Sequence, residues 1–106
     1  MIKRYCYAGD EFIGVLYFLP NDEYRFEWAD VSKFGSYARK FHELVNFSDT
    51  SHIRAYIHER CIPVGRPDRS MWLLLAGLSP NASEREIFLN ACGRSYMDAF
   101  SMREER

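Results

Sequence analysis

The hydrophobic residues of this chain change their spacing once, and this change constrains the fold more than any other feature of the sequence. Tyr24, Phe26 and Trp28 alternate with Arg25 and Glu27. A period of two predicts a β-strand with an aromatic face buried and a charged face in water. After residue 50 the apolar residues recur at helical spacing. The chain is therefore expected to be α+β, with strands first and helices after them.

Further strands are expected before this one. Residues 11–18, EFIGVLYF, are rich in β-branched and aromatic side chains and lie between turn-forming segments at 8–10 and 20–22. Residues 2–7 can pair with them, which gives an antiparallel meander. Gly14 lies inside the second strand, where a glycine indicates a bulge or a close approach by another backbone.

Helices are expected in the second half of the chain. The first is capped by Thr50 or Ser51, buries an apolar stripe and ends at Pro63. The next begins near Pro67, a residue suited to a first helical turn, and contains MWLLLA. It is expected to stop at Gly77, because a glycine just after the last turn commonly ends a helix.

The remaining elements complete a single domain. Another helix begins with a capping box formed by Ser83 and Glu86 and stops at Gly93. Residues 31–49 carry apolar side chains at helical spacing, and residues 95–102 are expected to return as a strand. The chain of 106 residues has the length of one domain and shows no linker or repeat. The prediction is an N-terminal antiparallel β-meander, short helices and a C-terminal returning strand.

Composition and charge exclude several classes of protein. Fourteen Lys and Arg against fifteen Asp and Glu give a net charge of -1, so no overall basic field exists to hold nucleic acid or an anionic membrane. The apolar runs fall far short of the ~20 residues that span a bilayer, and no signal peptide is recognisable. The cysteines, Cys6, Cys61 and Cys92, are widely spaced and odd in number, which favours free thiols. We expect a cytoplasmic protein with no membrane partner.

No arrangement in the sequence predicts catalysis. The spacing of His42, His52 and His58 relative to the cysteines matches no zinc motif. The glycines are scattered singly and form no phosphate-binding loop. Carboxylates are plentiful, but nothing in the sequence brings two of them together. We expect a protein that is not an enzyme and has no catalytic residue, cofactor or metal.

A modest basic excess offers one candidate binding surface. Arg54, Arg60, Arg66 and Arg69 lie in a stretch that holds only two acidic residues. Arginine binds carboxylates and phosphates through paired hydrogen bonds, so this stretch can dock an acidic partner. The alternative is a solvated helix face with local ion pairs.

The segment MWLLLA offers a second candidate. Five consecutive apolar residues, 71–75, wrap nearly the whole circumference of a helix, so they cannot all face one core. Either the sheet covers the remainder or a partner protein does. Trp72 is a favoured anchor for a partner, because tryptophan is enriched among the residues that dominate binding energy.

Three segments, taken in order, resemble the N-terminal subdomain of HipA-like serine/threonine kinases. The first is GDEFIGVLYFLPNDEYRFEWAD at 9–30, similar to the opening hairpin and aromatic-rich strand of that subdomain. The second is SHIRAYIHERCIPVGRPDRSMWLLLAGLS at 51–79, similar to its helix, Ile-Pro bend, arginine-bearing turn and following helix. The third is EREIFLNACGRSYMDAFSM at 84–102, which resembles its last helix, turn and closing strand. The sequence contains none of the kinase's catalytic motifs.

The resemblance implies a free-standing regulatory partner. In split systems of this family, a small HipS-like protein is encoded beside a HipT-like kinase and a HipB-like DNA-binding protein. By resemblance, the chain is expected to bind and restrain a HipA- or HipT-like kinase in an antitoxin-like role, without binding nucleic acid directly. The expected contact residues are Trp72, Arg66, Arg69, Met71 and Leu75.

Other functions remain open. One is an inhibitor carried by a phage or mobile element and directed at another target, such as an anti-CRISPR protein. Another is a small nucleic-acid-binding module that uses the arginines between residues 54 and 69. Binding by such a module would fall steeply with salt, because each phosphate contact releases counterions.

Overall fold

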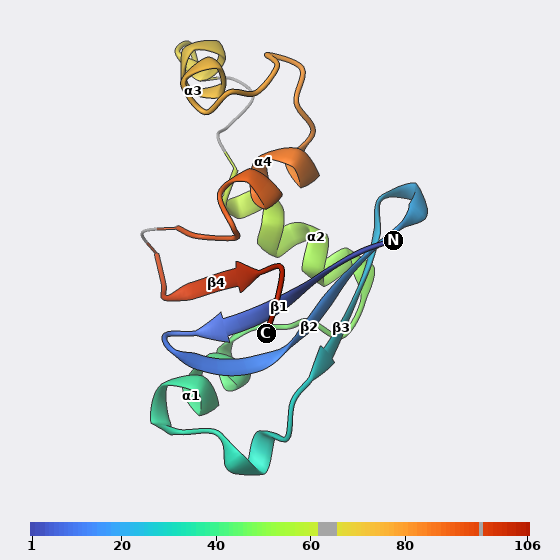
Figure 1. The fold of residues 1–106 in the computed structure, drawn as a ribbon, viewed down its shortest axis with the longest axis vertical. Coiled ribbons are helices and arrows are strands. Elements are labelled where there is room, and N and C mark those ends of the chain that lie inside the picture. The colour runs from blue at the N-terminus through green and yellow to red at the C-terminus, as the bar shows by residue number, and fades with distance from the viewer. Residues whose placement is uncertain (62–65, 96) are drawn as a thin grey trace.

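The computed structural model describes residues 1–61, 66–95 and 97–106 of the chain. It confirms the α+β class and the expected order of meander, helices and returning strand (Figure 1). The strands are β1 (Ile2–Ala8), β2 (Glu11–Leu19), β3 (Glu23–Trp28) and β4 (Phe100–Arg103). The helices are α1 (Ser36–Leu44), α2 (Thr50–Glu59), α3 (Arg69–Leu75) and α4 (Glu84–Asn90). Short 3-10 turns at Pro20–Asp22 and Val31–Lys33 flank β3.

The described strands form an antiparallel sheet in the order β3-β2-β1-β4. The first three are the expected meander, and β4 returns to pair with β1. The sequence predicts a last strand that begins at residue 95, but β4 begins at Phe100. The reason is that the Asp98 carboxylate accepts a hydrogen bond from the Phe100 amide, in a turn where Ser95 bridges to Asp98. Tyr96, part of the predicted strand, lies outside the described residues.

Gly14 is required by the geometry of β2. The register of β1 against β2 shifts between Cys6 and Tyr7, which marks a bulge beside this glycine. Gly14 has a φ of +155°, and a Cβ atom there would lie 2.7 Å from the Phe26 ring and overlap the carbonyl oxygen of Glu27. Both expectations for this residue, a bulge and a close approach, are confirmed.

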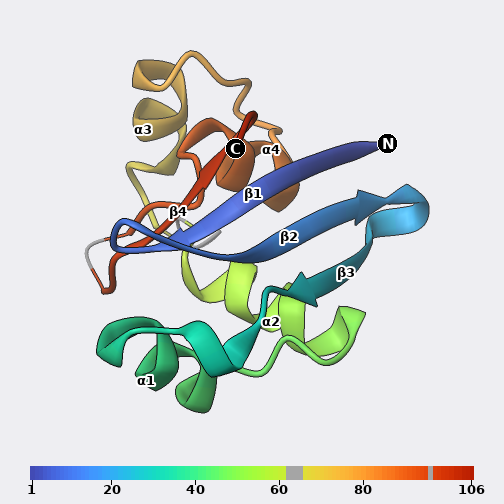
Figure 2. The ribbon, with the colours of Figure 1, turned by 60° about the horizontal axis from the view of Figure 1, so that its bottom comes forward.

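The core lies between the sheet and the helices on one of its faces. In Figure 2, β1, β2 and β3 lie above α1 and α2. The alternating aromatic side chains of β3 pack into this core, as predicted. Phe100 stacks on Phe41 at 5.8 Å and on Phe88 at 6.2 Å between ring centroids. Aromatic pairs of this kind add roughly 0.5–1.5 kcal/mol beyond the burial of their area.

The predicted cap of α2 is wrong by one or two residues. The helix begins after Asp49, whose carboxylate accepts a backbone hydrogen bond in the first turn, and not after Thr50 or Ser51. Thr50 has another task, because its Oγ1 accepts a hydrogen bond from the Tyr24 amide and donates one to the Tyr24 carbonyl. The predicted end of this helix at Pro63 lies outside the described residues.

The other helix ends follow the sequence closely. α3 begins after Asp68 and is followed by Gly77 at φ +77°, as expected. α4 has the predicted capping box, in which Ser83 Oγ accepts from the Glu86 amide at 3.1 Å and the Glu86 carboxylate accepts from the Ser83 amide at 3.5 Å. The helix predicted within 31–49 is α1.

Candidate functional site

α3 presents most of its apolar side chains to solvent. Met71 is 53% exposed, Trp72 45%, Leu74 72% and Leu75 71%, and we call this surface the α3 face. Figure 1 shows α3 at one end of the molecule, beyond α4 and away from the sheet. The sequence left open whether the sheet or a partner protein covers the apolar residues of this helix that do not face the core. The structure shows that the sheet does not cover them.

The opposite side of α3 attaches it to the rest of the chain. Leu73 is 1% exposed and packs with Ala82 and Ile87 in a cluster separate from the main core. Arg69 Nη1 donates to the carbonyl oxygen of Pro80 at 3.2 Å. Residues four apart share a helix face, so Arg69 and Leu73 form the inner side of α3. The α3 face is thus a stable outer surface of an anchored helix.

Trp72 is held in position although it is nearly half exposed. Its Nε1 donates to the Asp68 carboxylate at 2.8 Å, and the Arg66 guanidinium lies 5.8 Å from the ring centroid. Arg66 also forms an ion pair with Asp68. Hydrogen bonds from Arg66 and Trp72 hold the pKa of Asp68 below its ordinary value, so the carboxylate is ionised at neutral pH. A side chain ordered before binding loses less entropy when a partner covers it.

The structure gathers most of the predicted contact residues. The contact residues expected from the sequence are Trp72, Arg66, Arg69, Met71 and Leu75. Three of them belong to the α3 face, and Arg66 lies against the Trp72 ring. Arg69 does not join them, because it turns inward to Pro80. Leu74 belongs to the face and was not predicted, because the sequence does not show which of its adjacent leucines the core takes.

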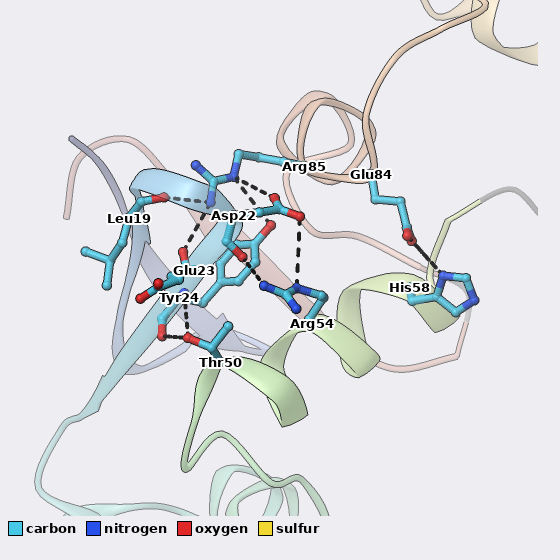
Figure 3. Close-up of polar contacts among 9 residues, drawn as sticks. All are labelled: Leu19, Asp22, Glu23, Tyr24, Thr50, Arg54, His58, Glu84 and Arg85. Atoms are coloured by element: carbon cyan, nitrogen blue, oxygen red, sulfur yellow. Dashed lines mark hydrogen bonds and ion pairs between the residues drawn. The ribbon is translucent and has the colours of Figure 1, made fainter.

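The basic stretch between residues 54 and 69 does not form one surface. Arg54 Nη2 donates to the carbonyl oxygen of Asp22 at 2.6 Å, at the β2–β3 turn (Figure 3). Arg60 is buried, and the other two arginines belong to the segment around α3. Each guanidinium already contacts a carboxylate or a carbonyl group. The structure therefore separates the arginines that the sequence places close together.

Arg85 of α4 attaches that helix to the β2–β3 turn (Figure 3). Its Nη2 donates to the carbonyl oxygen of Leu19 at 2.9 Å, and its Nε lies 3.7 Å from the Asp22 carboxylate. The guanidinium also lies 4.9 Å from the centroid of the Tyr24 ring, and burial raises the pKa of the Tyr24 hydroxyl. Asp22 thus faces Arg54 on one side and Arg85 on the other. This cluster ties α2 and α4 to one turn, which is a structural role.

Arg60 is the centre of a buried polar clasp. Its side chain is 2% exposed and donates to both carboxylate oxygens of Asp98 at 2.9 Å. It also donates to the Gly93 carbonyl at 2.8 and 3.1 Å and to the Tyr56 hydroxyl at 2.8 Å. Tyr56 in turn donates to Asp98 at 2.9 Å. The clasp fixes the turn before β4 to α2, and its main partners lie 38 residues apart in the sequence.

The titratable groups of the clasp each keep one protonation state near neutral pH. Burial acts to raise the pKa of the Asp98 carboxyl, but hydrogen bonds from Arg60, the Phe100 amide and Tyr56 outweigh it and hold that pKa below its ordinary value. Burial raises the pKa of the Tyr56 hydroxyl, which therefore stays protonated. Neither group is suited to exchanging a proton near neutral pH.

The cysteines and metal-binding side chains do not converge. Cys6, Cys61 and Cys92 are all free, and burial raises the pKa of Cys6 and of Cys61 to about 12. Within residues 1–61, 66–95 and 97–106, no group of three His, Cys, Asp or Glu side chains lies close enough to hold a metal ion. The chemistry that the site offers is apolar contact with an aromatic anchor.

In the part of the chain that the structure describes, no helix combines the length and the apolar character needed to cross a membrane. Comparisons with protein families, with characterised proteins and with solved structures give no significant match.

Proposed function

We propose that this chain is a non-catalytic regulatory partner that binds a HipA-like serine/threonine kinase through the α3 face and restrains it. The observation that supports this proposal is the exposure of apolar side chains on a helix with only Leu73 buried. An exposed apolar patch next to polar groups is typical of a protein interaction site. We propose a kinase as the partner because the motifs at 9–30, 51–79 and 84–102 resemble the regulatory subdomain of that family.

The exposed area sets the scale of the binding energy. The side chains of the α3 face are 45% to 72% exposed. Full burial of one large apolar side chain contributes roughly 1.5–3 kcal/mol, so covering this face contributes on the order of 4–7 kcal/mol. Association costs at least about 4 kcal/mol in lost freedom of motion. A stable pair therefore needs contacts around the face as well, and Arg66 is suitably placed to make one.

The proposal places the pair in the cytoplasm. The cysteines described in the structure are unpaired, which fits a reducing compartment. A HipB-like DNA-binding protein is proposed as a third component, bound to the kinase. Nucleic acid would then be held by that component and not by this chain, whose net charge is -1.

Copurification tests the proposal with a matched pair of variants. Tagged wild type, Leu74→Asp and Met97→Asp proteins are isolated from the cells that make the protein, and the copurified proteins are identified by mass spectrometry. Leu74 is 72% exposed on α3 and Met97 is 51% exposed before β4, so each substitution lies outside the core. We expect a HipA-like kinase at one-to-one stoichiometry with wild type and Met97→Asp. We expect its loss with Leu74→Asp.

Other outcomes would contradict the proposal. Recovery of a nuclease complex in place of a kinase would favour an inhibitor of another target. Recovery of nucleic acid that is released by salt would favour a nucleic-acid-binding module. Equal recovery of the kinase with all variants would show that the α3 face is not the contact.

A further inference from the structure

β3 forms an edge of the sheet, and only part of that edge is covered. Its neighbour within the described sheet is β2, on one side. On the other side, the Tyr24 amide donates to Thr50 Oγ1 at 3.0 Å, and that hydroxyl donates to the Tyr24 carbonyl at 2.9 Å. One threonine at the start of α2 therefore occupies the edge at this residue.

The edge beyond Tyr24 is open. In an antiparallel pair, alternate residues direct their backbone groups toward the neighbouring strand and away from it. Phe26 and Trp28 lie two and four residues after Tyr24, so their amides and carbonyls also point away from β2. Among the described residues, none forms a backbone hydrogen bond with Phe26 or Trp28 on that side. Unpaired edges of this kind are places where another strand can add.

A groove of about 550 Å³ lies along this open edge. β3 contributes Phe26 and Trp28 to its lining, and the other side is formed by residues 42–48, the end of α1 and the connection to α2. Figure 2 shows that connection running below β3. Phe47 stacks on Trp28 with ring centroids 5.7 Å apart, and Leu44 is 74% exposed at the groove. The groove therefore has apolar side chains from Trp28, Leu44 and Phe47, which we call the apolar wall, beside polar side chains and the hydrogen-bonding edge of β3.

These features specify the shape of an occupant. Free amides and carbonyls in a row are satisfied in register by an extended chain, which is the basis of strand addition. Alternate side chains of an added strand point to opposite faces, so one set meets the apolar wall and the other meets solvent.

The charges specify its composition. Among the described residues that line the groove are the acidic Glu43 and no lysine or arginine, and Glu43 makes no ion pair with another described residue. The solvent face of β3 carries Glu23, Arg25 and Glu27, with a net charge of -1. Opposite charges on neighbouring strands are favourable, and like charges are unfavourable.

We propose that the open edge of β3 binds an extended segment of a partner protein, with alternating apolar and basic residues, as an added strand. This site is separate from the α3 face, because α1 and α3 lie toward opposite ends of the molecule (Figure 1). It does not depend on the identity of the kinase. The protein would thereby hold two partner segments at once.

A synthetic peptide of repeated Lys-Val units, with blocked ends, tests this site in the full chain. Binding is followed by NMR, with hydrogen exchange of the Phe26 and Trp28 amides as the site-specific readout. We expect these amides to exchange fast in the free protein and to become protected at least about tenfold when peptide is bound. The matched control is the same peptide with N-methylated valines, whose valine amides cannot donate hydrogen bonds to the edge. It should give no protection.

Two variants with the same added charge locate the site. Leu44→Lys removes an apolar wall residue, whereas Leu75→Lys alters an equally exposed leucine on α3. We expect Leu44→Lys to weaken peptide binding at least about tenfold and Leu75→Lys to leave it within about twofold, since tenfold corresponds to 1.4 kcal/mol.

Three results would overturn the proposal. The first is equal binding of the N-methylated peptide. The second is equal weakening by both lysine variants, which would indicate general charge repulsion. The third is protection of the Phe26 and Trp28 amides in a peptide-free dimer, which would assign the edge to a second copy.

Discussion

Replacement of Asp98 by alanine removes the acidic partner of a buried cation. The Arg60 side chain is 2% exposed and the Asp98 side chain 22% exposed, and two hydrogen bonds of 2.9 Å join them. In Asp98→Ala, the hydrogen-bond partners left to the guanidinium among the described residues are the Gly93 carbonyl and the Tyr56 hydroxyl. A buried charge without its counterion cannot regain the hydration that it lost on folding.

The expected loss of stability is large for a chain of this size. Breaking a buried ion pair by removing one partner costs about 3–5 kcal/mol. We take about 3 kcal/mol, because Asp98 is partly exposed and water can reach the vacated space. A domain of about 100 residues loses about 4–8 °C in Tm per kcal/mol, so Tm should fall by about 12–24 °C. The Tm of Asp98→Asn should fall less, because the amide oxygen still accepts a hydrogen bond from Arg60.

The dependence on pH supplies an independent check. The folded pKa of Asp98 lies below its ordinary value of about 3.9, so the unfolded chain binds the proton more readily. The stabilisation is therefore complete above about pH 4 and is lost as the pH falls through the folded pKa. Urea unfolding, followed by circular dichroism, should show this acid loss in wild type and a weaker one in Asp98→Asn. A loss below about 1 kcal/mol for Asp98→Ala at neutral pH would refute the clasp.

Two further perturbations test other parts of the fold. Gly14→Ala should lower the free energy of unfolding by about 1–3 kcal/mol, because the added methyl group would overlap the neighbouring strand. Urea titration measures this loss, and an unchanged midpoint would contradict the bulge geometry. Iodoacetamide at about pH 8 should label Cys92 before the other thiols in the native protein, because Cys92 is exposed and burial raises the pKa of Cys6 and Cys61 to about 12. Equal labelling rates by mass spectrometry would contradict that order.

The sequence predicts the local features of this fold well. Alternation over 24–28 is a property of neighbouring residues, and so are the capping box at Ser83 and the stop at Gly77. Each of these signals depends on contacts within a few positions. The structure confirms them because nothing distant overrides them.

Features that depend on distant residues were not predictable in this way. Asp49 is the N-cap of α2 because the Thr50 side chain forms hydrogen bonds with the backbone of Tyr24, 26 residues earlier in the chain. The final strand starts late because the Asp98 carboxylate bonds the Phe100 amide in the turn before it, and Arg60, 38 residues from Asp98, holds that carboxylate in place. No periodicity in a single sequence reveals such pairs.

The candidate site also combines a feature that neighbouring residues predict with one that depends on distant residues. Five adjacent apolar residues on one helix are enough to predict that some lie outside the core. Which ones lie outside depends on Leu73 packing against Ala82 and Ile87, a contact that the sequence does not encode locally. This is why Leu74 was omitted from the predicted contact face and Arg69 was included.

The most direct test of the central claim is the affinity of purified wild type and Trp72→Ala proteins for a HipA-like kinase, measured by isothermal titration calorimetry. Trp72 is 45% exposed, so the variant should keep its Tm within a few degrees. Loss of an aromatic anchor costs at least about 2 kcal/mol, so we expect the affinity of Trp72→Ala to be about thirtyfold lower with the fold intact. Unchanged affinity would place Trp72 outside any contact with the kinase, and unfolding of the variant would show that Trp72 supports the fold and is not a free anchor.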